Sequence, residues 1–390
     1  MLHPGGHRRD FPAAGRQDSR RDEPERRLRP ASAGLPRREC VDKSCENHPE
    51  LHWHRESDGM EKIMNILVYG VAADSGGALS VLMDFYKEFR QNRSNHYYFV
   101  ISTPHIEDCE NITVLRFPEV KKGWWYRLFF EFIKAPQLIK KYHIDEIFST
   151  TNTVLPCVKK RQILYLHQPL PFVKYKFSLL KNSKFWIYQN VISCLIIHAT
   201  QKADKVIVQT NWMKEAVSRV SKINPDKITI SPPHIDTSGI QKYHRNSTNT
   251  FFYPAGAYEY KNHVVIISAC KKLKDKGIEN YNVIFTLSGQ ENKYARYLKE
   301  IVDQYSLPIH FVGSLPRKTV LSLYSSTFLL FPSFIETFGL PLLEARLSHA
   351  PIIAANTVFA REILSDYAYV SYFEKDDYIE LSKEMEHIVT

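Results

Sequence analysis

The most concentrated chemistry in this sequence lies in residues 331–345, where two carboxylates follow an apolar run. Glu336 and Glu344 have seven residues between them. The apolar residues 327–331 predict a buried strand, and Pro341 predicts a helix just beyond it, because the first helical turn does not need the N–H that proline lacks. We expect both carboxylates to face one crevice and to contact different parts of an elongated ligand. This arrangement suits a sugar nucleotide.

Backbone amides between the two carboxylates are candidates for binding phosphate oxygens. Phe338, Gly339 and Leu340 would lie at the N-terminus of the expected helix, where amides have no intrahelical acceptor and anions are favoured. Gly339 has no side chain, so a ligand can approach the backbone closely there. The competing interpretation is an ordinary solvated helix cap that binds nothing.

This segment resembles the donor-site signature of the retaining GT-B glycosyltransferases called group 1 or family 4. The resemblance rests on the E-x7-E spacing of Glu336 and Glu344 with Phe-Gly-Leu-Pro between them. It implies an α/β fold with two facing Rossmann-like domains and the active site in the interdomain cleft. It also implies that Glu336 contacts the transferred sugar, that Glu344 holds the ribose hydroxyls, and that the amides of residues 338–340 face the sugar and the diphosphate.

Length and composition limit the function classes that remain. The chain has 390 residues, 44% of them apolar, which is enough for two domains with separate cores. Its six cysteines show no CxxC spacing, which argues against zinc and disulfides and favours a reducing compartment. No apolar run approaches the roughly 18 residues that span a bilayer, and no secretory signal is evident. We expect a cytoplasmic protein, able to lie peripherally on the inner face of the plasma membrane.

The formal net charge of +10 comes mostly from lysines spread along the chain. Because they do not cluster in a recognition helix, a nucleic-acid partner is disfavoured. Phosphate-bearing substrates and anionic phospholipid surfaces fit this charge better.

Residues 1–59 differ in kind from the rest of the chain. They contain eleven arginines and one lysine, whereas the remainder contains eleven arginines and twenty-nine lysines. They lack periodic apolar residues and cannot bury a core, so we expect a disordered or non-native extension, with Met60 or Met64 as the natural start. A basic interaction tail is the alternative.

The first domain is expected over residues 60–238 and begins with a strand at 64–70, a loop at 71–78 and a helix to about 90. This order is typical of a Rossmann-like unit. The loop lacks the GxGxxG pattern, which disfavours an NAD-type oxidoreductase. The family resemblance implies that Gly76 and Gly77 lie near the donor phosphates and the acceptor, whereas a plain βα turn explains them equally well.

A histidine follows a later strand of this domain. The strand at 162–167 ends at His167, and ligands bind at the carboxyl ends of strands in open α/β sheets. The resemblance implies that His167 lies beside the transferred sugar. A surface loop histidine is the alternative.

Residues 121–134 combine aromatic and basic side chains. Trp124, Trp125 and Arg127, flanked by lysines, suit a helix that lies in a membrane interface, and core packing against the sheet explains the same residues. Both interpretations stay open. A second aromatic and basic region at 172–186 could add to the same surface.

The second domain is expected over residues 250–390, after a linker at 239–249. Gly256 and Lys261 precede a helix, where Lys261 can place a point charge on a diphosphate. The resemblance implies a Gly-Arg pair followed by a lysine in this loop, and this chain has Ala257 in the arginine position. We therefore expect weaker phosphate binding, or a shared role for Arg317, which could also be a surface arginine.

The resemblance thus implies an enzyme that transfers a hexosyl group from a nucleotide sugar to a glycan or lipid-linked hydroxyl, with retention and without metal or cofactor. Glu336, His167 and Lys261 are the candidate catalytic residues. The lysine- and isoleucine-rich composition suggests a bacterial polysaccharide, lipopolysaccharide or O-antigen pathway by analogy. The alternative is a catalytically weak scaffold of the same fold, favoured by Ala257 and by a C-terminal helix that looks short.

Overall fold

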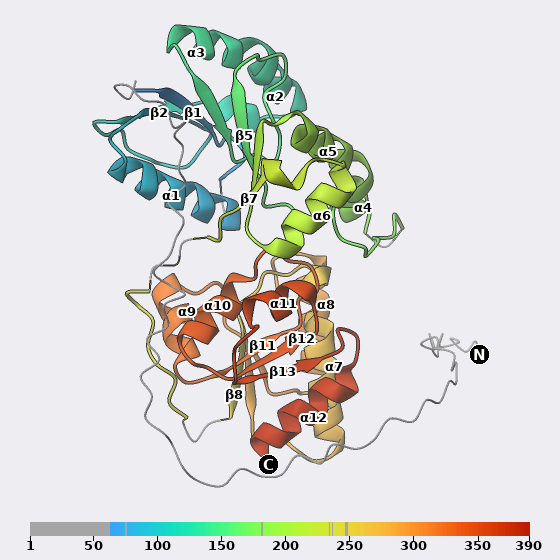
Figure 1. The fold of residues 1–390 in the computed structure, drawn as a ribbon. Helices are drawn as coiled ribbons and strands as arrows, with labels where there is room; N and C mark the ends of the chain where they lie inside the picture. The colour runs from blue at the N-terminus through green and yellow to red at the C-terminus, as the bar shows by residue number, and fades with distance from the viewer. Residues whose placement is uncertain (1–62, 75, 181, 234, 236, 246–248) are drawn as a thin grey trace, which may run out of the picture. The chain divides into compact units, whose positions relative to one another are not determined.

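Two parallel β-sheets with flanking helices make up the described chain (Figure 1). The computed structural model describes residues 63–390 except 75, 181, 234, 236 and 246–248. The expectations for residues 1–59 therefore lie outside the described residues. Every pair of neighbouring strands in both sheets is parallel, as the alternation of strands and helices in the sequence predicts.

The first sheet has seven strands in the order β3-β2-β1-β4-β5-β6-β7. The direction of winding reverses between β1 and β4, the kind of place where open α/β sheets bind ligands. The strands are β1 (Asn65–Tyr69), β2 (His96–Ile101), β3 (Ile112–Arg116), β4 (Glu146–Ser149), β5 (Arg161–Tyr165), β6 (Lys205–Val208) and β7 (Ile228–Ile230).

Helices cover the two faces of this sheet unequally. On one face, Val68 and Phe148 pack with α1 (Gly76–Gln91). On the other face, Tyr69 is in register with Ser149, and Ser149 with Leu164. Residues 130–139, 192–199 and 213–217 contribute to the clusters of Tyr69 and of Leu164 on that second face. These residues and their immediate chain neighbours form the remaining helices of this part of the chain. These helices are α2 (Trp124–Phe129), the π-helical η3 (Phe130–Lys134), α3 (Ala135–Lys141), α4 (Ser183–Ile187), the π-helical η4 (Tyr188–Ile192), α5 (Ser193–Lys202) and α6 (Asn211–Ser221).

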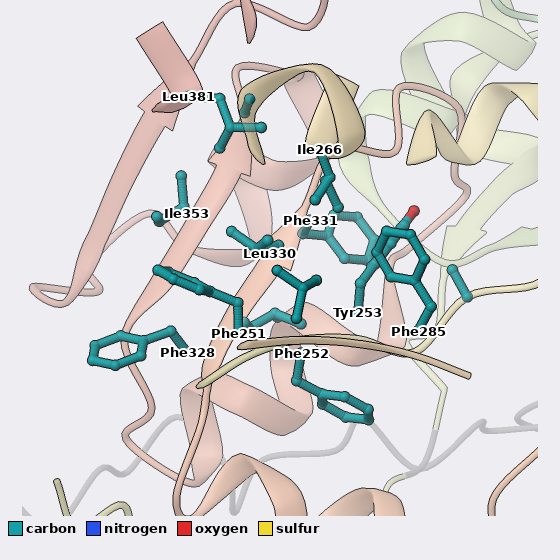
Figure 2. Close-up of a cluster of buried hydrophobic side chains, with 14 of the residues drawn as sticks. Phe251, Phe252, Tyr253, Ile266, Phe285, Phe328, Leu330, Phe331, Ile353 and Leu381 are labelled. Carbon is teal, nitrogen blue, oxygen red and sulfur yellow. The ribbon is translucent and has the colours of Figure 1, made fainter. Parts of the chain in front are cut away.

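The second sheet has six strands in the order β10-β9-β8-β11-β12-β13. Its core is rich in phenylalanine, and Figure 2 shows the buried rings of Phe251, Phe285 and Phe331 gathered around the strands. Apolar residues on both faces are expected for a parallel sheet that helices cover on both sides. The strands are β8 (Thr250–Tyr253), β9 (Asn282–Phe285), β10 (Ile309–Phe311), β11 (Phe328–Phe331), β12 (Ile352–Ala355) and β13 (Val370–Phe373).

Six helices flank the second sheet. One group contains α7 (His263–Asp275), α8 (Lys293–Gln304) and α12 (Tyr378–Val389), which pack against one another. The other contains α9 (Arg317–Tyr324), α10 (Leu340–Leu347) and α11 (Val358–Ile363). Figure 1 shows the two groups on opposite sides of the strands. Within the described residues, no helix combines the length and the apolar character that crossing a bilayer requires.

Candidate active site

The loop between β11 and α10 carries both expected carboxylates. Gly339 is the residue before α10 and has a left-handed backbone, with φ at 92° and ψ at 59°. Its carbonyl accepts a hydrogen bond from the amide of Leu342 at 2.9 Å, and a Cβ on Gly339 would lie 3.2 Å from the Leu342 side chain. Glycine is therefore required here both for its conformation and for space. Pro341 lies in the first turn of α10, as the sequence predicts.

Glu336, the first carboxylate, is held by two side chains from neighbouring loops. Its Oε1 accepts a hydrogen bond from the Ser333 hydroxyl at 2.7 Å and forms an ion pair with Lys261. The backbone carbonyl of Lys261 in turn accepts a hydrogen bond from the Tyr253 hydroxyl at 2.6 Å. Burial raises the pKa of Tyr253 well above its usual value, so this hydroxyl stays protonated and donates. The sequence predicts Lys261 and Glu336 near the same ligand, and the structure brings them into contact.

Glu344, the second carboxylate, is buried in α10 and binds two side chains from α9. Its Oε1 accepts a hydrogen bond from Arg317 Nη1 at 2.7 Å, and its Oε2 accepts one from the Tyr324 hydroxyl at 3.0 Å. Arg317 thus contacts Glu344, the candidate for binding the ribose. Its expected contact with a phosphate would require a second hydrogen bond from the guanidinium or another rotamer of Arg317. Sequence reasoning did not identify Tyr324. Its spacing of seven residues from Arg317 places both on one side of α9, which is the only signal available.

The loop after β8 lines a pocket of about 510 Å³ at the carboxyl ends of β8 and β9. Gly256 borders it, and a Cβ there would lie 3.2 Å from the ring of Tyr258. Ala257, at the position where the resemblance implies a second cation, is buried, and its carbonyl accepts a hydrogen bond from the Asn292 side chain at 2.8 Å. Thr286 and Leu287 from the end of β9 complete this side of the pocket, whose size suits part of a nucleotide.

His167 follows β5 and makes its hydrogen bonds with Asn152. The His167 amide donates to Asn152 Oδ1 at 2.9 Å, which turns Asn152 Nδ2 toward His167 Nε2 at 3.2 Å. Nε2 must therefore accept, and the ring proton lies on Nδ1. Burial lowers the pKa of His167 to about 4, so the ring is neutral near pH 7. Nδ1 is buried and has no hydrogen-bond partner among the described residues.

Gly76 and Gly77 occupy the first turn of α1, so the loop that the sequence analysis placed at residues 71–78 ends earlier than expected. A Cβ on Gly77 would meet nothing within 4 Å. A ligand could therefore approach the backbone of this turn closely. The backbone conformation at position 77 does not itself require glycine.

The N-terminus of α6 contacts the loop that carries Glu336. The carbonyl of Thr337 accepts hydrogen bonds from the Thr210 hydroxyl at 2.9 Å and from Trp212 Nε1 at 3.1 Å. The carboxylate of Glu362 accepts from the amides of Asn211 at 2.7 Å and Trp212 at 3.0 Å. A side chain from α11 thus caps α6 and satisfies two of its free amides.

Two family models match adjacent parts of the chain. The model described as Glycosyltransferase Family 4 matches residues 75–238, and the model described as Glycosyl transferases group 1 matches residues 237–390. This chain is a group 1 glycosyltransferase. The second match includes Glu336, Gly339 and Glu344, so the motif that suggested the family lies inside the region that identifies it.

Known proteins resemble this glycosyltransferase at low sequence identity. The O-antigen chain mannosyltransferase RfbU of Salmonella typhimurium is 24% identical over 284 residues, which are 72% of this chain and 73% of RfbU. Sucrose-phosphate synthase of Thermosynechococcus elongatus has a TM-score of 0.67 at 16% identity, covering 83% of this chain and 89% of the synthase.

Two further solved structures share the fold. WaaG, a glycosyltransferase involved in lipopolysaccharide biosynthesis, has a TM-score of 0.64 at 14% identity, covering 84% of this chain and 90% of WaaG. HepE of Anabaena, in complex with UDP-glucose, has a TM-score of 0.61 at 15% identity, covering 83% of this chain and 89% of HepE. The predicted GT-B class, with two Rossmann-like sheets, is confirmed.

Proposed function

We propose that this glycosyltransferase moves a hexosyl group from a nucleoside-diphosphate sugar to a hydroxyl of a glycan or lipid-linked acceptor, with retention of configuration. The observation that carries the proposal is the placement of Glu336 and Glu344 on either side of the left-handed Gly339, each beside a cationic side chain. RfbU is named as an O-antigen chain mannosyltransferase, and HepE binds UDP-glucose, which supports a hexose donor and a polysaccharide acceptor. Retention rests on the family resemblance.

Glu344 is the residue we assign to the ribose hydroxyls of the donor. An ionised carboxylate has about four lone-pair positions, and Arg317 and Tyr324 use two of them. Their bonds hold the carboxylate in one orientation and leave acceptor positions for two adjacent hydroxyls. The nucleoside would then occupy the pocket beside Gly256.

Lys261 and the amides of residues 338–340 are the groups we assign to the diphosphate. Negative charge grows on the leaving phosphate as the glycosidic bond breaks, so a cation and a helix N-terminus there stabilise the transition state more than the ground state. We assign this task to the protein's own groups, with no metal ion or cofactor. Gly76 and Gly77 would bring the first turn of α1 close to the phosphates from the acceptor side.

The sugar itself is assigned to Glu336 and His167. Glu336 would accept hydrogen bonds from the hexose hydroxyls once Lys261 turns to the diphosphate. His167 would donate from Nδ1, the ring atom that the contact with Asn152 leaves protonated. We place the enzyme in the cytoplasm, in keeping with its scattered thiols.

Titration of the full chain with GDP, UDP, ADP and dTDP by calorimetry, followed by radiolabelled transfer from the matching sugar nucleotides, tests this function. We expect one diphosphate to bind, and the product anomer, determined by NMR, to match the donor. Glu336→Gln should keep the affinity and lose turnover, whereas Glu300→Gln, an exposed change on α8, should match the wild type. A diphosphate that binds without any sugar transfer would favour the weak scaffold, the alternative that Ala257 supports.

A further inference from the structure

The outer side of α2 and η3 carries large apolar side chains in solvent. Trp124 is 63% exposed and Trp125 is 83% exposed. They begin two rows of apolar side chains in which successive residues are four positions apart. Apolar side chains at this spacing normally lie on the face of a helix that packs against the core. The exposed members of the two rows are Trp124, Leu128 and Phe132, and Trp125, Phe129 and Ile133. An exposed apolar surface of this kind marks an interaction site.

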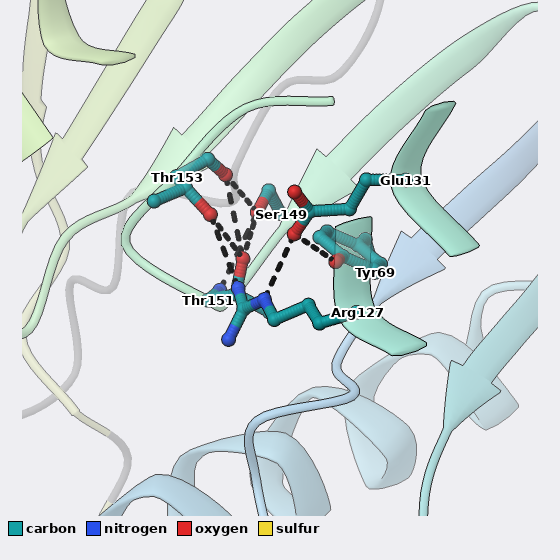
Figure 3. A network of polar contacts seen from close by, with 6 residues as sticks. All are labelled: Tyr69, Arg127, Glu131, Ser149, Thr151 and Thr153. Atoms are coloured by element: carbon teal, nitrogen blue, oxygen red, sulfur yellow. Dashed lines mark hydrogen bonds and ion pairs between the residues drawn. The ribbon is translucent and has the colours of Figure 1, made fainter. Parts of the chain in front are cut away.

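The inner side of the same segment is fixed to the sheet by a polar network (Figure 3). Glu131 Oε1 accepts hydrogen bonds from the Tyr69 hydroxyl at 2.7 Å and from Arg127 Nε at 2.8 Å. Phe130 is buried beneath them and stacks on Tyr69 with ring centroids 6.1 Å apart. Rotating the helix to bury the tryptophans would break these contacts. Core packing, one of the two interpretations left open by the sequence, holds for Phe130 and is wrong for Trp124 and Trp125.

The membrane-interface interpretation needs one correction, which concerns Arg127. The sequence predicts it among the basic residues of a membrane interface, but it points inward, pairs with Glu131 and contacts Thr153 Oγ1 at 3.4 Å. Lys121 is also engaged, because it binds Asp74 Oδ2 at 2.8 Å. Lys122 and Lys134 are exposed beside the aromatic rows.

A second helical segment beside the first sheet also carries a row of exposed apolar side chains. Ile187, Val191 and Leu195 follow one another at a spacing of four along α4, η4 and α5, and all three are exposed. Leu180, in the preceding loop, is 96% exposed. No aspartate or glutamate occurs in residues 173–203, whereas five lysines do.

The two segments cover the same face of the first sheet. Phe130 packs in the cluster of Tyr69, and Ile196 of α5 packs in the cluster of Leu164. Tyr69 and Leu164 are both in register with Ser149, so they lie on one side of the sheet. The outer sides of η3 and α5 therefore point away from that one side.

We propose that these outer sides together form a docking surface for an anionic lipid bilayer. We define the docking surface by its exposed apolar residues, Trp124, Trp125, Leu128, Phe129, Phe132, Ile133, Leu180, Ile187, Val191 and Leu195. Tryptophan and leucine fit the boundary between headgroups and acyl chains, and the neighbouring lysines fit anionic headgroups. The cores of protein–protein interfaces are instead depleted in lysine. Lipid binding through this surface does not depend on the donor-site assignments.

Sedimentation of the full chain with vesicles tests the proposal. We expect binding to an equal mixture of phosphatidylcholine and phosphatidylglycerol, little binding to phosphatidylcholine alone, and weaker binding as salt screens the lysines. Tryptophan emission should shift to the blue on binding, as the rings of Trp124 and Trp125 leave water. Lys122→Glu/Lys134→Glu should weaken partition by more than about tenfold, from the contribution of each cation near an anionic surface.

Matched variants on the second sheet's side of the chain provide the controls. Trp124→Ala/Trp125→Ala should lose vesicle binding, whereas Val358→Ala/Tyr369→Ala, at side chains 68% and 60% exposed, should bind as the wild type does. Lys318→Glu/Lys383→Glu should likewise retain most binding. Thermal melting of every variant should match the wild type, because all these side chains are exposed.

Two outcomes would overturn the proposal. One is a folded Trp124→Ala/Trp125→Ala protein that sediments with the mixed vesicles as the wild type does. The other is a wild type that does not bind vesicles but forms a dimer, together with loss of that dimer in the double variant. The docking surface would then be an interface between two copies of the chain. Sugar transfer to a soluble acceptor should be unchanged in the double variant, so failure of lipid binding and failure of the enzymatic assignment are separable.

Discussion

Lys261 forms an ion pair with Glu336, so the cation assigned to the donor's phosphates lies on the carboxylate assigned to its sugar. Both side chains are largely buried, and Ser333 holds the carboxylate from a second direction. Leaving either charge without a partner in this largely buried place would be costly, so each group needs a partner before the donor binds. Donor binding would then exchange one anionic partner of Lys261 for another.

The first prediction concerns that exchange. Lys261→Met should weaken nucleoside diphosphate binding by roughly ten- to hundredfold, the loss expected for one charged hydrogen bond of about 1.5 to 3 kcal/mol. Calorimetric titration measures the effect, and Lys383→Met, an exposed change on α12, is the control. Unchanged affinity in the Lys261 variant would remove this residue from the diphosphate site.

Glu344 should govern affinity rather than turnover. Glu344→Ala should weaken diphosphate binding by about ten- to hundredfold, because the ribose loses its charged acceptor. Tyr324→Phe should have a smaller effect in the same direction, since it removes only the hydrogen bond that orients the carboxylate. The prediction fails if Glu344→Ala lowers kcat and leaves the dissociation constant of the diphosphate unchanged.

Gly339 and Gly77 form a matched pair of glycine substitutions. Gly339→Ala forces a side chain into a left-handed backbone and against Leu342, and should lower the free energy of unfolding by about 1 to 3 kcal/mol. Gly77→Ala lies in a helical turn with open space and should raise stability by roughly 0.4 to 1 kcal/mol. Urea denaturation of both variants measures the two signs.

Acid should destabilise the native state through two buried histidines. Burial lowers the pKa of His263 to about 3 and that of His167 to about 4, whereas an unfolded histidine titrates near 6.5. The unfolded chain therefore binds more protons between these values, and the free energy of unfolding falls as pH drops below about 6.5. His263→Leu should show a smaller fall in melting temperature between neutral and acidic buffer. The exposed change His310→Gln should show the wild-type fall.

The network around Glu131 should contribute to stability although it lies near the surface. Arg127→Ala leaves the largely buried Glu131 carboxylate without its cation and should lower the free energy of unfolding by about 2 to 3 kcal/mol. Arg127→Met/Glu131→Met should cost less than Arg127→Ala alone, because no buried charge is left unpaired. Equal losses in chemical denaturation of the two proteins would argue that the ion pair contributes little.

Much of the fold could be predicted from local patterns. The short apolar runs in the sequence correspond to successive strands, and the segments between them correspond to helices. Pro341 and Gly339 mark the start of α10. The strand β13 was not predicted, because Val370–Phe373 contains a serine and a tyrosine and lies at the edge of its sheet. The π-helical segments were also missed, since a single extra residue in a helical turn leaves no clear periodicity.

The candidate site was predictable where chemistry follows sequence order and not where it depends on tertiary pairing. Glu336 and Glu344 are linked by one loop, so their spacing is visible in the sequence. The pairing of Arg317 with Glu344 joins two helices and depends on how they pack. Asn152, the partner of His167, has a left-handed backbone with φ at 61°, a conformation that asparagine adopts more readily than most residues.

The fastening of α2 and η3 to the first sheet has a mechanical consequence. The hydroxyl of Tyr69, the last residue of β1, donates a hydrogen bond to Glu131. Lys121, just before α2, binds the carbonyl of Ala72 and the carboxylate of Asp74, which precede Gly76 in the chain. The segment with the exposed tryptophans is thus joined to β1 on its inner side and, through Lys121, to residues 72 and 74 ahead of α1. A tilt of this segment would therefore change the contacts of Lys121 with Ala72 and Asp74.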